Sequence, residues 1–237
     1  MKNIIITGGA NGIGKETALL FSKNNNVIII DNDKEKLEKL KGVIGIDIYK
    51  CDISNEKEIY KTFLIIKKKY KKIDILINNA SQQIESSLDN TKIKEWKHII
   101  DINLTGTFIV IKQALNLMSN GATILNVISV HHNIPRKNKY HYDSSKAGVA
   151  MLTKEIAIEL AEKGITVNAI SFGAVDTNMN KDWTSNIEMI NNVLEKVPLK
   201  ILFKPEQIAT FIELIINNFS RYTTGSIFTI DGGRSLL

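Results

Sequence analysis

The sequence predicts an α/β protein built on a doubly wound parallel sheet of about seven strands, with helices on both faces. Apolar stretches of strand length, rich in Ile and Val, alternate along the chain with amphipathic stretches of helix length. Most of the strand stretches are apolar throughout, which is typical of strands that are covered on both faces. Right-handed crossovers between such strands place helices on both sides of one sheet.

The first half of the chain supplies four of the strands. The first is a β-branched run that ends at a glycine-rich turn, the second ends at Asp31, and the third is weaker because its apolar residues alternate with polar ones. The helices between them have apolar residues on one face, as Ile59, Phe63 and Ile66 show in the third helix. The expected strands cover residues 4–7, 27–30, 43–49 and 73–77, and the expected helices cover residues 15–23, 34–40 and 55–70.

The second half continues the alternation with longer helices. The expected helices cover residues 96–118, 142–163 and 205–217, and the expected strands cover residues 123–128, 166–171 and 226–230. Residues 173–204 form an irregular stretch, the longest between core elements, and we interpret it as a substrate lid. No repeat, low-complexity linker or charge block marks a boundary, so we expect one domain over residues 1–237.

Composition excludes several classes of protein. A chain of 237 residues can bury about 70% of its surface, so its core can be stable without disulfides or structural metal ions. The single cysteine, Cys51, permits no internal disulfide, and no apolar run approaches a membrane span or a signal peptide, so we expect a cytoplasmic protein with no membrane partner. The formal charge is +6, but 28 of the 31 basic residues are lysines, which does not favour base-reading contacts with nucleic acid.

A glycine-rich turn between the first strand and the first helix predicts a phosphate-binding site. Gly8, Gly12 and Gly14 lie in the run Thr-Gly-Gly-Ala-Asn-Gly-Ile-Gly, where a backbone without Cβ atoms can approach a pyrophosphate at a helix N-terminus. Asp31, which ends the second strand, can accept both hydroxyls of an adenosine ribose. It would repel a 2′-phosphate, and the neighbouring Asn11 and Asn32 are neutral, so we predict NAD as the cofactor.

Tyr142 and Lys146 form the candidate chemical site. The two residues are four apart and share a helix face. A tyrosine has a pKa near 10, and a nearby ammonium would stabilise its phenolate so that it can act as a base. A tyrosine–lysine pair at this spacing is also common on helix surfaces, so the pair alone does not establish catalysis.

Together these motifs resemble the short-chain dehydrogenase/reductase family over residues 2–233. The resemblance implies a single Rossmann-type sheet in strand order 3-2-1-4-5-6-7. It also implies a catalytic tetrad of Asn103, Ser129, Tyr142 and Lys146. The cofactor contacts that it implies, together with those from the glycine turn, are Gly8, Asn11, Gly12, Ile13, Gly14, Asp31, Asp52, Ile53, Asn79, Ala80, Tyr142, Lys146, Gly173, Val175 and Thr177.

The resemblance implies a role for each member of the tetrad. Tyr142 would be the general acid/base on the substrate oxygen, and Lys146 would lower its pKa and hold the nicotinamide ribose. Ser129 would hydrogen-bond the substrate oxygen, and Asn103 would hold a water that connects Lys146 to solvent. Two positions depart from the family pattern: Phe172 replaces a proline and Ser81 replaces a glycine, and either could alter cofactor affinity.

The substrate is less defined. Ser129-Val130-His131-His132-Asn133-Ile134-Pro135, followed by His141-Tyr142, is similar to a pattern of glucose 1-dehydrogenases, which favours a sugar or secondary alcohol. Gln83 and His131 are the expected substrate contacts beside Tyr142, although these histidines could equally cap their loop or face solvent. We expect no metal, because adjacent histidine rings point apart and no further ligand completes a set.

Two other functions remain open at this stage. One is a 3-oxoacyl carrier-protein reductase, a branch that normally prefers NADPH, which Asp31 disfavours. The other is a non-catalytic cofactor-sensing or nucleic-acid-binding protein, and the retained tetrad argues against it. The helices around residues 104–118 and 149–160 are apolar over much of their circumference, and family members pair the equivalent helices, so we expect a homotetramer.

Overall fold

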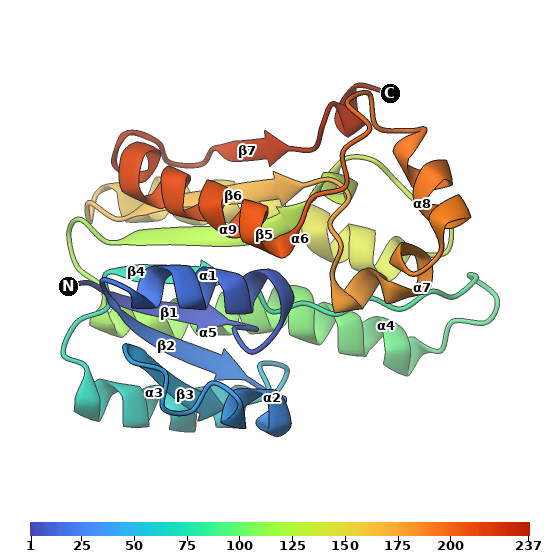
Figure 1. The fold of residues 1–237 in the computed structure, drawn as a ribbon. Coiled ribbons are helices and arrows are strands. Elements are labelled where there is room, and N and C mark those ends of the chain that lie inside the picture. Colours follow the sequence, from blue (N-terminus) through green and yellow to red (C-terminus); the bar gives the residue numbers. More distant parts are fainter.

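The computed structural model describes residues 1–237 and contains one parallel sheet of seven strands in the order β3-β2-β1-β4-β5-β6-β7 (Figure 1). This order and the helices around the sheet confirm the predicted fold class. The strands are β1 (Asn3–Thr7), β2 (Asn26–Asp31), β3 (Ile46–Lys50), β4 (Ile75–Asn78), β5 (Thr123–Ser129), β6 (Thr166–Phe172) and β7 (Ile227–Ile230).

Two helical layers cover the sheet because successive strand residues point to opposite faces. In β1, Ile4 and Ile6 pack in one hydrophobic cluster with α1 (Gly12–Ser22), α2 (Lys34–Glu38) and α9 (Pro205–Leu214). Ile5 packs in the other, with α3 (Glu56–Lys69), α5 (Thr107–Ala114) and α6 (Tyr140–Ala161). Figure 1 shows α1 and α9 together over one face of the sheet. All three isoleucines are fully buried, which explains why the strands read as continuous apolar runs.

The helix expected over residues 96–118 is divided. It begins as α4 (Ile93–Ile100), passes through a π-helical turn at Asp101–Gly106, and continues as α5. A π turn adds one residue to a helical repeat without breaking the apolar pattern, so nothing in that pattern predicts it. The turn matters for the site because it carries Asn103.

Residues 173–204 are more regular than the sequence predicts. They contain the short helices α7 (Lys181–Thr184) and α8 (Ile187–Leu194), and the Asn186 side chain caps α8 by accepting hydrogen bonds from Glu188 N and Met189 N. A parallel bridge between Val175 and Phe203 joins the two ends of the segment. In Figure 1, α7 and α8 lie beyond the arrowheads of β5 and β6, at the carboxyl edge of the sheet. No helix of the protein is both long and apolar enough to span a bilayer.

Candidate active site

The glycine-rich turn after β1 is shaped by close backbone approach. A Cβ atom at Gly14 would lie 2.1 Å from the carbonyl oxygen of Gly8, and Gly8 itself has a φ of +64°. Gly14 therefore has no room for a side chain, and the backbone conformation of Gly8 is one that L-residues rarely adopt. The turn therefore brings bare backbone to the N-terminus of α1, as the phosphate-site prediction requires.

The turn is held from the neighbouring strand β4. Asn79 Nδ2 donates hydrogen bonds to the carbonyl oxygens of Thr7 and Gly8, at 3.2 and 2.9 Å. In return, Thr7 Oγ1 accepts from the backbone nitrogens of Asn79 and Ala80, both at 3.1 Å. Asn79 and Ala80 thus fix the shape of the turn in addition to lining the cavity described below.

Asp31 lies at the carboxyl end of β2, beside the same turn. Its Oδ2 accepts a hydrogen bond from Ala10 N and its Oδ1 accepts one from Asp33 N, both at 3.0 Å. Each carboxylate oxygen keeps a free lone pair for a further donor. Lys36 also lines the cavity here, a cation that the sequence analysis did not consider, and its ammonium pairs with Asp33 at 2.6 Å.

A cavity of about 650 Å³ runs along the carboxyl edge of the sheet, from the glycine-rich turn to Tyr142 and Lys146. Most of the residues predicted to bind the cofactor line this cavity. Gly12 and Gly14 shape the glycine-rich turn but do not line the cavity. The lining residues from that set are Gly8, Asn11, Ile13, Asp31, Asp52, Ile53, Asn79, Ala80, Tyr142, Lys146, Gly173, Val175 and Thr177.

These residues fit a nicotinamide dinucleotide on structural grounds. The turn that a Cβ would fill suits a pyrophosphate, and Asp31 offers acceptors to a ribose. At the other end, Ser81 Oγ is buried and has no hydrogen-bond partner within the chain. An Asn178–Asn11 hydrogen bond of 3.0 Å ties the start of the 173–204 segment to the glycine-rich turn across the cavity.

Tyr142 and Lys146 lie one turn apart on α6 and are almost completely buried, with exposed fractions of 9% and 3%. Lys146 Nζ donates to the carbonyl oxygen of Val127 on β5 at 3.0 Å and lies 5.5 Å from the centre of the Tyr142 ring. Burial lowers the pKa of Lys146 to about 7. The alternative that Tyr142 and Lys146 form an ordinary pair on a helix surface is therefore wrong, since neither side chain faces solvent.

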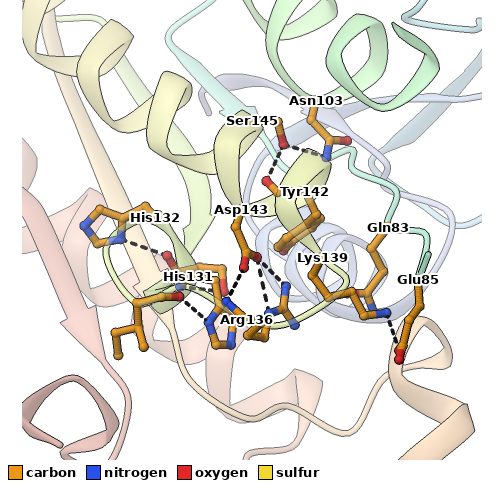
Figure 2. Close-up of polar contacts among 12 residues, drawn as sticks. Gln83, Glu85, Asn103, His131, His132, Arg136, Lys139, Tyr142, Asp143 and Ser145 are labelled. Carbon is orange, nitrogen blue, oxygen red and sulfur yellow. Dashed lines mark hydrogen bonds and ion pairs between the residues drawn. The ribbon is translucent and has the colours of Figure 1, made fainter. Parts of the chain in front are cut away.

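Burial also raises the pKa of the Tyr142 phenol. The Arg136 guanidinium, whose central carbon lies 5.2 Å from the centre of the Tyr142 ring, acts to lower this pKa, and Asp143 acts to raise it. The nearby hydroxyls of Ser129 and Ser81 also act to lower it. Figure 2 shows Arg136, Asp143 and Tyr142 gathered at the start of α6. Two cations thus lie near the phenol: Lys146, which the sequence predicts there, and Arg136, which it does not.

Ser129 and Asn103 occupy different positions relative to the cavity. Ser129 ends β5 and lines the cavity, and its Oγ also accepts from His131 N at 3.3 Å. Asn103 does not line the cavity. Its Nδ2 donates to Gln82 O and Ser145 Oγ, at 2.9 and 3.0 Å, and its Oδ1 accepts from Gln82 N at 2.9 Å. Its side chain joins the π turn to α6 and to the 82–83 loop.

Both expected substrate contacts line the cavity near Tyr142, but each is engaged within the chain. Gln83 Nε2 donates to Met179 O at 3.0 Å and to Asn180 Oδ1 at 3.2 Å. The Nδ1 atoms of His131 and His132 hydrogen-bond backbone oxygens of their own loop, those of Ile134 and Ser129 (Figure 2). Burial lowers the pKa of His131 to about 4, so its ring is neutral near pH 7. The loop-capping alternative therefore holds for both histidines, and only His131 also faces the cavity.

Known proteins share this architecture over essentially the whole chain. A family model described as enoyl-(acyl carrier protein) reductase matches residues 8–235. Glucose 1-dehydrogenase 2 of Bacillus subtilis is 33% identical over 99% of this chain and 95% of its own length. The 3-oxoacyl-[acyl-carrier-protein] reductase FabG of Thermotoga maritima is 34% identical, covering 98% and 97%. The solved structure of 4-hydroxyisoleucine dehydrogenase complexed with NADH superposes with a TM-score of 0.94 at 28% identity, covering all of both chains.

The fold, the cavity and these relatives define a class of enzyme, an oxidoreductase that acts on alcohol or ketone groups with a nicotinamide cofactor. The chain belongs to the short-chain dehydrogenase/reductase family. The family uses NAD or NADP, and its relatives at similar identity differ in substrate, so cofactor choice and substrate must be argued from this chain's own residues.

Proposed function

We propose that this protein is an NAD-dependent oxidoreductase that transfers a hydride between the nicotinamide and a sugar or a secondary alcohol or ketone. One observation carries the proposal: Tyr142 and Lys146 are buried together at one end of the cavity that begins at the glycine-rich turn. When bound, the nicotinamide cofactor accepts or supplies the hydride, and the protein positions the substrate and moves the proton.

The proton passes through Tyr142. In oxidation the phenolate oxygen of Tyr142 accepts the proton of the substrate hydroxyl, and in reduction the phenol donates it to the carbonyl oxygen. Ser129 donates a hydrogen bond to that same oxygen as negative charge develops on it. Protonated Lys146 favours the phenolate by Coulomb attraction and, through its remaining N–H donors, holds the nicotinamide ribose. Asn103 positions this group by joining the π turn to α6 through its hydrogen bond to Ser145 Oγ, and we propose that it also holds the water that connects Lys146 to solvent.

We further propose that 3-oxoacyl carrier-protein reduction is the second candidate activity. It is supported by the 34% identity with the Thermotoga maritima FabG protein. The sugar activity is supported by the comparable identity with the Bacillus subtilis glucose 1-dehydrogenase and by Gln83 and His131 beside Tyr142. The segment over residues 173–204, which places Trp183 in the cavity wall, would act as the lid.

A homotetramer is part of the proposal. Phe108 on α5 and Met151 and Ile158 on α6 are exposed apolar side chains with exposed fractions of 46%, 56% and 78%. Exposed apolar groups on two neighbouring helices favour association with further copies of the chain. Light scattering should therefore give about four times the 26.6 kDa mass of the chain, and a single-chain mass would contradict this assembly.

The choice of NAD follows from the Asp31 carboxylate. Asp31→Asn removes the charge that repels a 2′-phosphate while keeping an oxygen for Ala10 N. We expect the ratio of kcat/KM with NAD to that with NADP to exceed 10 in the wild type and to fall at least tenfold in the variant, about 1.4 kcal/mol of discrimination. Asp89→Asn, an exposed carboxylate outside the cavity, is the matched control and should keep the wild-type ratio. Equal use of NADPH by the wild type would refute the NAD assignment.

Tyr142→Phe tests the proton transfer. Removal of the phenol oxygen should lower kcat by roughly 10²–10⁴-fold, the range for loss of a general acid/base, while NAD binding measured by fluorescence stays within a few-fold. Tyr140→Phe is the matched control, because the Tyr140 hydroxyl hydrogen-bonds Ser87 O and Thr91 Oγ1 outside the cavity. The substrates to test are glucose, 3-hydroxybutyrate and an acetoacetyl thioester. The proposed function would be overturned if the Tyr142 variant turned over any of them at near the wild-type rate.

A further inference from the structure

The distribution of arginine in this chain is uneven. The sequence has 28 lysines and three arginines, at positions 136, 221 and 234. Two of the three, Arg136 and Arg234, line the cavity, and the third is exposed elsewhere. Arginine differs from lysine by a planar fork of donors that matches a carboxylate or phosphate with two parallel hydrogen bonds. Two of the three arginines thus line the cavity, where such a fork is available to a bound anion.

Arg136 is held in place and still has free donors. Its Nε and Nη2 donate to Asp143 Oδ1 at 3.2 and 2.7 Å, and its backbone nitrogen donates to Asp143 Oδ2 at 2.9 Å (Figure 2). A guanidinium has five N–H donors, so the Nη1 edge remains unused within the chain. The side chain is 27% exposed, and its guanidinium carbon lies 5.2 Å from the centre of the Tyr142 ring.

Arg234 has no such partner. Its guanidinium forms no ion pair or hydrogen bond within the chain, although Arg234 is half-buried and lines the cavity. Lys196, which follows α8 and is exposed, is a second cation of the cavity wall without an acidic partner. Arg136 and Arg234 line the cavity together with His131, and both cations act to lower the His131 pKa.

Carboxylates lie only at the opposite end of the cavity. The acidic side chains that line it are Asp31, Asp33 and Asp52, all at the end proposed for the adenosine, and none belongs to the loops around Tyr142. Arg136 is paired with Asp143 and Lys196 is exposed, so a neutral substrate would leave Arg234 as the half-buried cation of the wall without an acidic partner. An anion bound to Arg234 and to the unused Nη1 of Arg136 would supply that partner.

We propose that the substrate of this site carries an oxyanion, a carboxylate or a phosphate, that Arg136 and Arg234 bind beside the reacting carbon. This inference rests on the proposed function, whose substrate class it narrows from neutral sugars and alcohols to hydroxy acids, oxo acids or phosphorylated sugars. Arg136 is largely buried next to Tyr142, so the anion belongs to the same small molecule as the reacting carbon and not to the surface of a protein partner.

Matched substrates test the charge directly. Glucose, glucuronate and glucose 6-phosphate share the reacting C1 and differ in carrying no anion, a carboxylate or a phosphate. Acetoacetate and methyl acetoacetate share the ketone and differ in the carboxylate alone. We expect at least one anionic member to exceed its neutral partner in kcat/KM by about tenfold or more, as for one charge-assisted hydrogen bond. The first series also distinguishes a carboxylate from a phosphate.

Two variants assign the effect to Arg234. Arg234→Met should raise KM for the preferred anionic substrate at least tenfold and leave kinetics with the neutral partner within about twofold, and Arg234→Lys should give an intermediate KM. Arg221→Met removes the same charge from an exposed position outside the cavity and is the matched control, with no expected change. If Arg234→Met does not fold, Arg234→Lys alone decides, because it keeps the charge and loses the fork.

A binding measurement separates this inference from the proposed function. Malonate and inorganic phosphate, each compared with chloride at equal ionic strength, should raise the unfolding temperature of the NAD-saturated wild type and of Arg221→Met, but not of Arg234→Met. Stabilisation that is equal in all three proteins, or absent from all, would overturn the anion site whether or not turnover is found. A neutral partner that is turned over as well as its anion would also overturn it while leaving the dehydrogenase in place. Stabilisation without turnover of any substrate would refute the proposed function alone.

Discussion

The site depends on one interaction, the burial of the Lys146 ammonium against the carbonyl oxygen of Val127. Removing a cation from water is costly, and one carbonyl partner offsets only part of the cost, so the pKa of Lys146 falls to about 7. The sheet makes the burial possible because α6 packs over the carboxyl ends of β5 and β6, where strand carbonyls remain available. Tyr142 is placed by the same packing, since it lies one helical turn from Lys146.

Much of the fold could be predicted from the sequence because its core is simple. Ile4, Ile5 and Ile6 are buried on both faces of β1, and runs of this kind identify parallel strands without an alignment. The π turn at Asp101–Gly106 could not be predicted, because the hydrophobic pattern continues through it. The two helices within residues 173–204 also escaped prediction, since neither contains a buried residue that would set a periodic pattern.

Part of the candidate site could also be predicted, because its residues stand at the ends of the predicted strands and at the start of a predicted helix. Gly8, Asp31, Ser129 and Tyr142 each end or follow a strand or begin a helix, and parallel strands bring such positions to one edge. Arg136 and Arg234 were missed because they lie in a loop and near the C-terminus, where only tertiary structure brings them together. The scarcity of arginine among the basic residues is a signal in the sequence, but by itself it indicates only that base-reading contacts with nucleic acid are disfavoured. The same packing that buries Lys146 thus leaves a buried ammonium 5.5 Å and a fixed guanidinium 5.2 Å from the centre of the Tyr142 ring.

The most direct test of the account is an NMR titration of the Lys146 side chain in the free protein, with Lys146→Met used to assign its resonance. If the ammonium is buried as described, it should titrate with a pKa of about 7, far below the lysines of the surface. A pKa near the ordinary value of about 10.4 would show that Lys146 is solvated, and would contradict the buried tyrosine–lysine pair on which the proposed chemistry depends.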